Sequence, residues 1–121
     1  HPDNQVKSIR TKGGNKITFH DQQGEEKILI SNGEHKQTAL EISFKGDGRI
    51  ELKTTGDISL TAGKNVSIEA GETLSLKATT IVAEASSKLD ARSKGETKLK
   101  GSTVQIQGST TDIQGLNINA S

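Results

Sequence analysis

Apolar and polar residues alternate in short units of about eight residues from Gly48 to the end of the chain. The stretch "GKNVSIEAGETLSLKA", residues 63–78, holds two of these units, and each opens with glycine, places two apolar residues two positions apart and closes on alanine. Alternation over four to five positions is typical of a strand with one buried face. A repeat of eight does not fit a helix, so each unit predicts a short strand followed by a tight corner.

About nine of these units, which we call octads, fill residues 48–121. Their apolar pairs recur in strict steps of eight up to residue 76, slip by one residue, and end less regularly in the pairs Thr111/Ile113 and Leu116/Ile118. Glycine, or a pair of Thr or Ser residues, stands between the strands, where a corner needs positive φ or close backbone approach. The large side chains expected to point inward are Ile50, Leu52, Ile58, Leu60, Val66, Ile68, Leu74, Leu76, Ile81, Leu89, Leu99, Val104, Ile106 and Ile113.

The first part of the chain shows longer alternating runs. Residues 15–32, "NKITFHDQQGEEKILISN", alternate on both sides of a polar centre, which predicts a hairpin with a short turn. Residues 39–44, "ALEISF", add another alternating strand that ends before an Asp-Gly pair. Both phenylalanines lie here, so we expect a wider base segment over residues 1–47 and an octad-repeat needle over residues 48–121, with the boundary at residues 46–48.

Composition narrows the fold further. Hydrophobic residues make up 29% and aromatic residues 2% of the 121 positions, which is too few large side chains to fill the centre of a compact globule. Disordered chains are also polar, but they lack regularly placed Ile, Val and Thr. A narrow, elongated β-structure in which small inward residues suffice fits both observations.

An octad period permits two architectures. In a single-chain β-helix three octads form one coil, and strands one coil apart stack on each other. In an intertwined trimer every octad is equivalent, and three chains share a thin core. The octads of this chain are alike, and an isolated ribbon with one buried face is marginal in water. The predicted fold is therefore all-β, a triple-stranded intertwined parallel β-helix formed by a homotrimer. One strand spacing of about 4.8 Å per octad gives a shaft of about 43 Å.

Charge and composition also exclude several functions. The net charge is +1, with Lys and Arg scattered singly among Asp and Glu, whereas nucleic-acid binding usually needs a basic stripe with stacking aromatics. No cysteine is present to form a disulfide framework. No apolar run reaches the roughly 18 residues of a membrane helix, and no signal peptide is visible. We expect no nucleic-acid partner.

Two groups of charged residues invite a catalytic interpretation. His20 and Asp21 stand near Glu25 and Glu26, but they fall on the predicted hairpin turn, where solvated charges are expected. Carboxylates also fall on outward positions of the octads, and paired carboxylates serve glycoside hydrolysis. A sugar site needs an aromatic-lined groove, and no aromatic lies beyond Phe44. The outward residues concerned are Glu84, Asp90, Arg92 and Glu96. We therefore predict a protein that is not an enzyme and has no catalytic residue, no metal site and no cofactor.

The hairpin segment carries a family likeness. Residues 13–32 are similar to the pattern N-x-I-x-F-x-D-x-x-G-x-E-x-I-x-I of valine–glycine-repeat spike proteins of type VI secretion systems. The octads resemble the C-terminal needle of the same family, which is related to the needles of contractile phage tails. The likeness covers essentially the whole chain, and the hairpin motif is its more specific part. The matching residues are Asn15, Ile17, Phe19, Asp21, Gly24, Glu26, Ile28 and Ile30.

The resemblance implies a mechanical function. Members of the family form trimers on top of a contractile tube, and sheath contraction drives the needle through a target membrane with effectors on the needle or on its cap. It implies assembly in the bacterial cytoplasm, injection into a target cell, and contact with the tube protein through N-terminal domains. Since the chain starts at His1 without a methionine and lacks those domains, we expect an excised C-terminal region.

The resemblance also bears on the tip. Related needles end either in a histidine-bound iron or beneath a separate cone-shaped PAAR-repeat protein, and the His-x-His motif for iron is absent here. We therefore expect a PAAR-repeat cap protein to dock on a blunt trimeric end. Leu116 and Ile118 either finish the core or present an apolar platform to this partner. The predicted docking residues are Leu116, Asn117, Ile118, Asn119, Ala120 and Ser121.

A second functional class stays open on the sequence. β-Helices also occur as adhesins and as enzymes that act on surface polysaccharide. Such a protein is expected to be a monomer with a carbohydrate-binding groove. A trimeric mass without hydrolytic activity favours the puncturing spike.

Overall fold

A computed structural model describes residues 5–33 and 37–119 of the chain. The chain divides into two units, residues 1–69 and 70–121. The regular elements in the described residues are β-strands, and no helix occurs among them. The predicted all-β class is confirmed.

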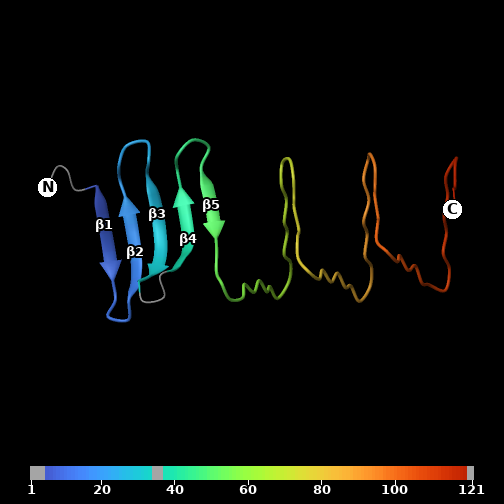
Figure 1. Ribbon diagram of the computed structural model, residues 1–121, viewed down its shortest axis with the longest axis horizontal. Coiled ribbons are helices and arrows are strands. Elements are labelled where there is room, and N and C mark those ends of the chain that lie inside the picture. The colour runs from blue at the N-terminus through green and yellow to red at the C-terminus, as the bar shows by residue number, and fades with distance from the viewer. Residues whose placement is uncertain (1–4, 34–36, 120–121) are drawn as a thin grey trace. The chain divides into compact units, whose positions relative to one another are not determined.

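The unit of residues 1–69 contains one open antiparallel sheet of five strands (Figure 1). Each strand pairs with the next one along the chain, in the spatial order β1-β2-β3-β4-β5. The strands are β1 (Val6–Arg10), β2 (Asn15–His20), β3 (Lys27–Asn32), β4 (Gln37–Ser43) and β5 (Arg49–Leu52). The predicted hairpin is confirmed as β2 and β3, and β4 covers most of the next alternating run. β1 has no counterpart among the predicted strands.

Local chemistry fixes the turns of this sheet. In the turn between β2 and β3 the amide of Glu25 donates to the carbonyl of Gln22 at 2.9 Å, and Gly24 between them has a φ of 83°. The turn between β4 and β5 holds Gly46 at 62° and Gly48 at 87°. Residues with a side chain are strained at such angles, so glycine allows the chain to reverse at these points.

The predicted domain boundary at residues 46–48 lies inside this sheet. β5 comes from the first octad, and all four of its residues pair with β4. The division between the two units of the chain falls further along, after residue 69. The first octad therefore shares a sheet with the strands of the base segment.

The register of the strands sorts their side chains onto two faces. Residues that face each other across the strands alternate between apolar rows and a mostly polar row, because successive side chains of a strand point to opposite faces. Two apolar rows, which we call the apolar sheet face, consist of Ile17, Ile30, Leu40 and Leu52, and of Phe19, Ile28, Ile42 and Ile50. On the other face Thr18 is 5% exposed and is the one buried residue among those described. No apolar side chain in the described residues is buried, so the sheet has no core of its own.

Beyond β5 the described residues of the octads form no sheet within their own chain. The amide of Lys53 still donates to the carbonyl of Ala39 at 2.9 Å. From Gly56 to Asn119, all within the described residues, the structure contains no backbone–backbone hydrogen bond. Figure 1 shows this part as a thin line with repeated changes of direction.

Regularly spaced bends mark the corners of the octads. They fall at residues 55–56, 63–64, 71–72, 79, 86–87, 94–95, 102–103, 109 and 116. Successive bends lie eight residues apart, and the step shortens to seven after residues 79, 102 and 109. The predicted spacing of about eight residues is confirmed, but the first step of seven between bends follows residue 79, whereas the apolar pairs already slip between Leu74 and Ile81.

Candidate functional site

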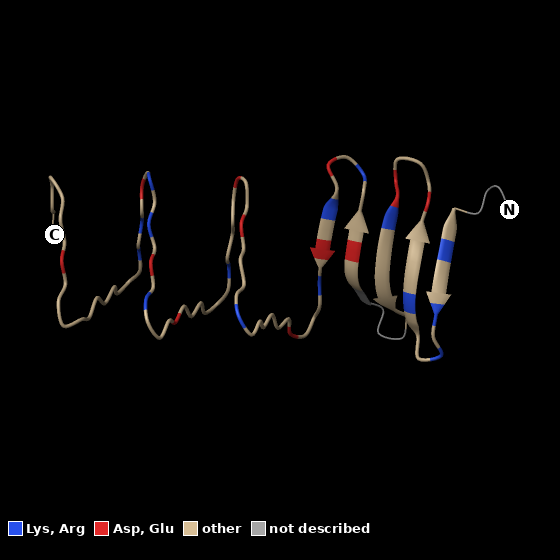
Figure 2. Cartoon of the chain, turned by 180° about the vertical axis from the view of Figure 1, so that it is seen from behind, with Lys and Arg blue, Asp and Glu red and all other residues tan. Residues whose placement is uncertain are grey.

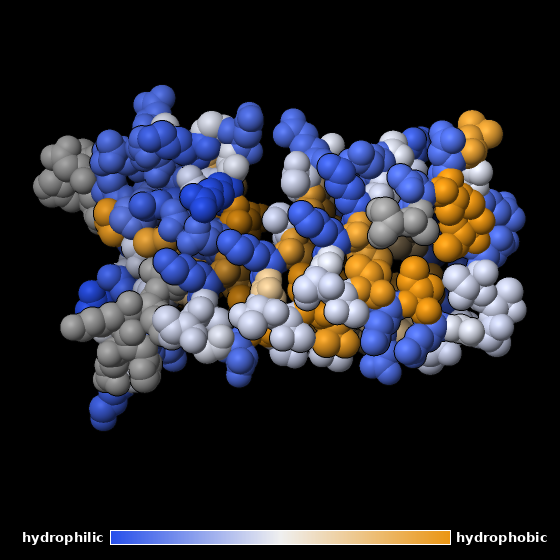
Figure 3. Space-filling model, turned by 45° about the vertical axis from the view of Figure 1, so that its right-hand side comes forward, coloured by the Kyte–Doolittle hydropathy of each residue, from blue (hydrophilic) through white to orange (hydrophobic). Residues whose placement is uncertain are grey.

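The candidate functional surface is made of uncovered apolar side chains. All fourteen residues that the sequence predicts to point inward are exposed, from 47% for Val104 to 76% for Leu99. The apolar sheet face is open as well, with Phe19 37% and Ile50 73% exposed. Figure 3 shows apolar side chains, in orange, uncovered between polar ones on the face in view. Soluble monomers rarely expose contiguous apolar patches of large size, so this surface is suited to contact with other chains.

Unpaired backbone groups accompany these side chains. Strand segments without a ladder leave their N–H and C=O groups to water or to a partner. A single-chain β-helix joins successive coils by backbone hydrogen bonds of its own and buries the side chains between them. Between Gly56 and Asn119, within the described residues, the structure has neither feature. This segment is therefore able to accept strands from other chains along its length.

Leu116 and Ile118 occupy different positions at the end of the repeat. Leu116 lies at a bend and is fully exposed at 103%, whereas Ile118 follows that bend by two residues, as Ile81 follows the bend at residue 79. Ile118 thus takes the first inward place of a further octad, while Leu116 lies at a corner. The structure thus separates Leu116 from Ile118, which the sequence pattern groups as one pair. Of the other predicted docking residues, Asn117 and Asn119 are exposed, and Ala120 and Ser121 lie outside the described residues.

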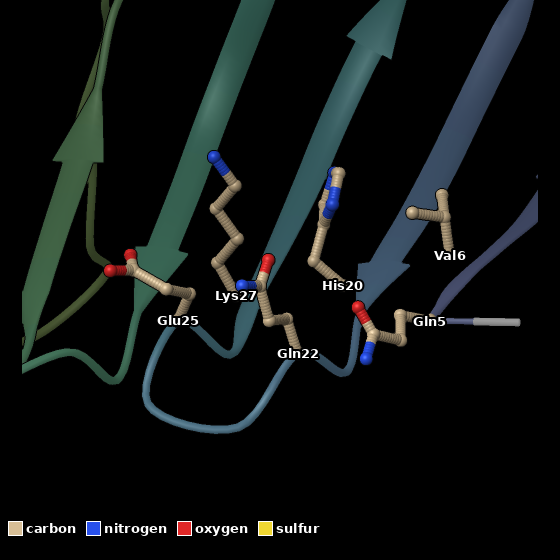
Figure 4. A pocket seen from close by; sticks show the side chains of 6 residues that line it. All are labelled: Gln5, Val6, His20, Gln22, Glu25 and Lys27. Carbon is tan, nitrogen blue, oxygen red and sulfur yellow. The ribbon is translucent and has the colours of Figure 1, made fainter. Parts of the chain in front are cut away.

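A shallow cavity of about 350 Å³ lies beside His20 at the end of β2 (Figure 4). The Glu25 carboxylate at its rim accepts a hydrogen bond from Lys45 Nζ at 2.8 Å, and this contact raises the pKa of Lys45. Among the described residues no group of three His, Asp or Glu side chains is placed to hold a metal ion. The cavity is lined by Gln5, Val6, His20, Gln22, Glu25 and Lys27. These features are those of a polar hairpin end.

Two of the acidic residues on the outer positions of the octads, Asp90 and Glu96, form ion pairs with basic neighbours. Asp90 Oδ2 lies 3.3 Å from Arg92 Nη2 and 3.6 Å from Lys88 Nζ. Glu96 Oε1 lies 3.2 Å from Lys98 Nζ. Each pair joins residues two apart on one strand segment, which therefore lie on the same side. The structure brings Asp90 and Arg92 together. Glu84 forms no ion pair with any residue that the structure describes.

β1 is the part of this surface that sequence reasoning missed. Its two apolar residues, Val6 and Ile9, are three positions apart and lie on opposite faces, so the strand shows no alternation. The signal that could find it is the register with β2, in which Ile9 faces Ile17 of the apolar sheet face. All five residues of β1 are exposed.

In the described ranges no helix is long and apolar enough to cross a bilayer. No protein-family model and no curated protein matches the chain.

Proposed function

We propose that this chain is one of three identical subunits of a needle. The octads of three copies wind around a common axis as an intertwined parallel β-helix, and each copy gives one strand to every layer. The observation that carries the proposal is the stretch from Gly56 to Asn119, whose described residues expose their apolar side chains and form no backbone ladder. Two further copies supply both missing contacts at once.

Burial of the octad side chains drives this assembly. Covering one Ile, Leu or Val fully contributes roughly 1.5–3 kcal/mol, and each new backbone hydrogen bond adds about 0.5–1.5 kcal/mol net. No apolar residue among those described is buried within one chain. A single chain therefore gains little hydrophobic stabilisation to offset the conformational entropy that it loses on folding. Folding and association are therefore expected to occur together.

The five-stranded sheet suits the same arrangement. Its apolar face is covered by no second layer of the described chain, and Phe19 on that face is exposed. The opposite face carries charged and hydroxyl side chains such as Glu41 and Ser8. Three copies of the apolar sheet face turned toward one axis bury their apolar rows and leave the polar rows to water.

Mechanical puncture is the function that such a needle supports best. The resemblance of residues 13–32 to the type VI spike motif favours a place at the end of a contractile tube. A repeated shaft with mixed surface charge suits a stiff, soluble rod that is driven through a target membrane (Figure 2). On this proposal the trimer carries effectors and docks a PAAR-repeat cap protein at the end marked by Leu116.

Native mass spectrometry of the 121-residue chain tests the assembly. The expected species has a mass of about 38 kDa, three times the 12.8 kDa of one chain. The spike role further predicts co-elution with a PAAR-repeat protein and no release of reducing sugar from bacterial polysaccharide. A stable monomer that cleaves or binds such a polysaccharide contradicts the proposal and favours the single-chain β-helix instead.

A further inference from the structure

The bends allow equivalent outward positions to be compared between octads. In the unit of residues 70–121 the position two residues before each bend is occupied in turn by Lys77, Glu84, Arg92, Lys100, Gln107 and Gln114. The first three of these alternate in sign from one octad to the next. Figure 2 shows such charged positions along the extended part of the chain. Because these residues lie in successive octads separated by corners, contacts within one strand segment do not account for the alternation of their charges.

Within one chain, the alternating charges of successive octads form no ion pairs with each other in the described residues. Each ion pair found in the described part of residues 70–121 joins residues two apart on one strand segment, as in Arg92 with Asp90. Lys77 and Glu84 have no ion pair within the described residues, and their neighbours two positions away carry no charge. Their alternating charge is therefore available to a partner.

A symmetric threefold winding gives each octad a defined neighbour in another copy. When a chain turns one corner, its next octad moves to the adjacent face of the needle and rises by one strand spacing of about 4.8 Å. That face already carries the preceding octad of another copy at the level below. Each octad of one copy thus lies beside the following octad of its neighbour.

We propose that a ladder of opposite charges between copies holds each octad beside the following octad of the neighbouring copy, a register that we call the one-octad stagger. The inference rests on the trimeric needle proposed above and adds the contact register between its subunits. In this register Lys77 of one copy lies beside Glu84 of the next, and Glu84 lies beside Arg92. The same stagger places Lys88 beside Glu96 and Asp90 beside Lys98. Within residues 70–121 four charged pairs are thus of opposite sign, and one pair, Arg92 with Lys100, is of like sign.

Other staggers give a worse match of charges. If two copies slip so that the same octad of each lies side by side on one face, each charge lies beside its own counterpart and like charges correspond throughout. With a stagger of three octads, as in a single-chain β-helix, Lys77 corresponds to Lys100 and Asp90 to Asp112, and residues 70–121 provide no pair of opposite sign. In the described residues before this unit, the one-octad stagger also places Arg49 beside Asp57.

The charges supply information that the apolar pairs lack. Because the octads are alike in their inward residues, a slip by one octad keeps every apolar residue facing the axis, and the core alone specifies the stagger weakly. Exposed ion pairs contribute little stability each, but like charges brought together by a wrong stagger oppose it. The ladder therefore acts on specificity more than on strength.

Cysteine crosslinking of the full chain tests the stagger, since the natural sequence contains no cysteine. Strands one spacing apart lie within the Cα separation that a disulfide spans. The double variant Glu84→Cys/Arg92→Cys, oxidised as a native trimer, is expected to run as a covalent trimer on a non-reducing denaturing gel. The matched double variant Lys77→Cys/Lys100→Cys and the single variant Glu84→Cys are expected to give no covalent trimer.

The outcomes separate the stagger from the trimer. A native trimer whose Glu84→Cys/Arg92→Cys variant forms no covalent trimer overturns the one-octad stagger and leaves the needle standing. A 12.8 kDa monomer in which the Lys77→Cys/Lys100→Cys pair links within one chain overturns both proposals.

A variant without cysteine adds an independent measurement. Lys100→Glu converts the like pair with Arg92 into an opposite one and is expected to raise the melting temperature of the trimer by a few degrees, unlike Lys94→Glu at a corner. A lower melting temperature for Lys100→Glu overturns the ladder.

Discussion

At the scale of single residues, each octad separates its core side chains from its surface side chains by one position. Leu74 and Leu76 follow the bend at residues 71–72, and Ser75 lies between them on the opposite side of the strand segment. In the proposed needle the three copies of Leu74 meet near the axis, while the three copies of Ser75 face water. Introducing a charge is therefore expected to prevent trimer assembly at position 74 and to be tolerated at position 75.

The variant Leu74→Asp tests this assignment. It places three carboxylates near one axis, where the effective cost of desolvating each ion is several kcal/mol, so we expect the chain to remain monomeric in size-exclusion chromatography with light scattering. The matched variant Ser75→Asp adds the same charge at an outward position and is expected to stay trimeric. Trimers of Leu74→Asp with an unchanged melting temperature contradict the inward assignment.

At the scale of elements, the sequence predicts a strand where alternation is long enough to be seen. The hairpin of β2 and β3 and the octad corners follow from apolar residues at every second position and from glycine or hydroxyl residues at the turns. β1 escapes prediction because its place depends on pairing with β2 rather than on a pattern of its own. The position of Leu116 escapes it because a Leu-x-Ile spacing looks the same at a corner as within a strand.

Two turns at one end of the sheet are joined by the ion pair between Glu25 and Lys45. The hydrogen bond to the Glu25 carboxylate, with the attraction of its charge, raises the pKa of Lys45 above its ordinary value of 10.5. A pKa raised by folding stabilises the fold below the unfolded value and ceases to do so as the pH rises through the folded value.

We therefore expect the melting temperature of the natural chain to exceed that of Lys45→Gln by a small, constant amount from about pH 6 to 9. The difference is small because both side chains are exposed and solvent screens their attraction. It is expected to decrease as the pH rises above 10.5 and to vanish once the pH exceeds the raised pKa of Lys45 in the folded protein. Circular dichroism melts of the two proteins at each pH measure it, and a difference that grows above pH 10.5 contradicts the assignment.

At the scale of the whole molecule, stability and association are the same property. Among the described residues no apolar side chain is buried within one chain, so the folded state of the proposed needle exists only as the trimer. Its melting temperature is then expected to rise with protein concentration, as for obligate oligomers. The specific surface that such an assembly offers to a different protein is its end, because the shaft repeats one pattern.

The end of the repeat separates assembly from recognition. Leu116 is fully exposed at a bend, so Leu116→Ser is expected to leave the melting temperature unchanged, whereas Ile118→Ser removes an inward side chain and lowers it. A PAAR-repeat cap that covers three copies of Leu116 gains roughly 1.5–3 kcal/mol of binding free energy per buried side chain. Leu116→Ser is therefore expected to weaken cap binding at least tenfold in calorimetry.

Deletion of residues 116–121 is expected to abolish cap binding and to leave a folded trimer, because the bends up to residue 109 are untouched. A deletion variant that still binds the cap places recognition on the shaft instead of the tip.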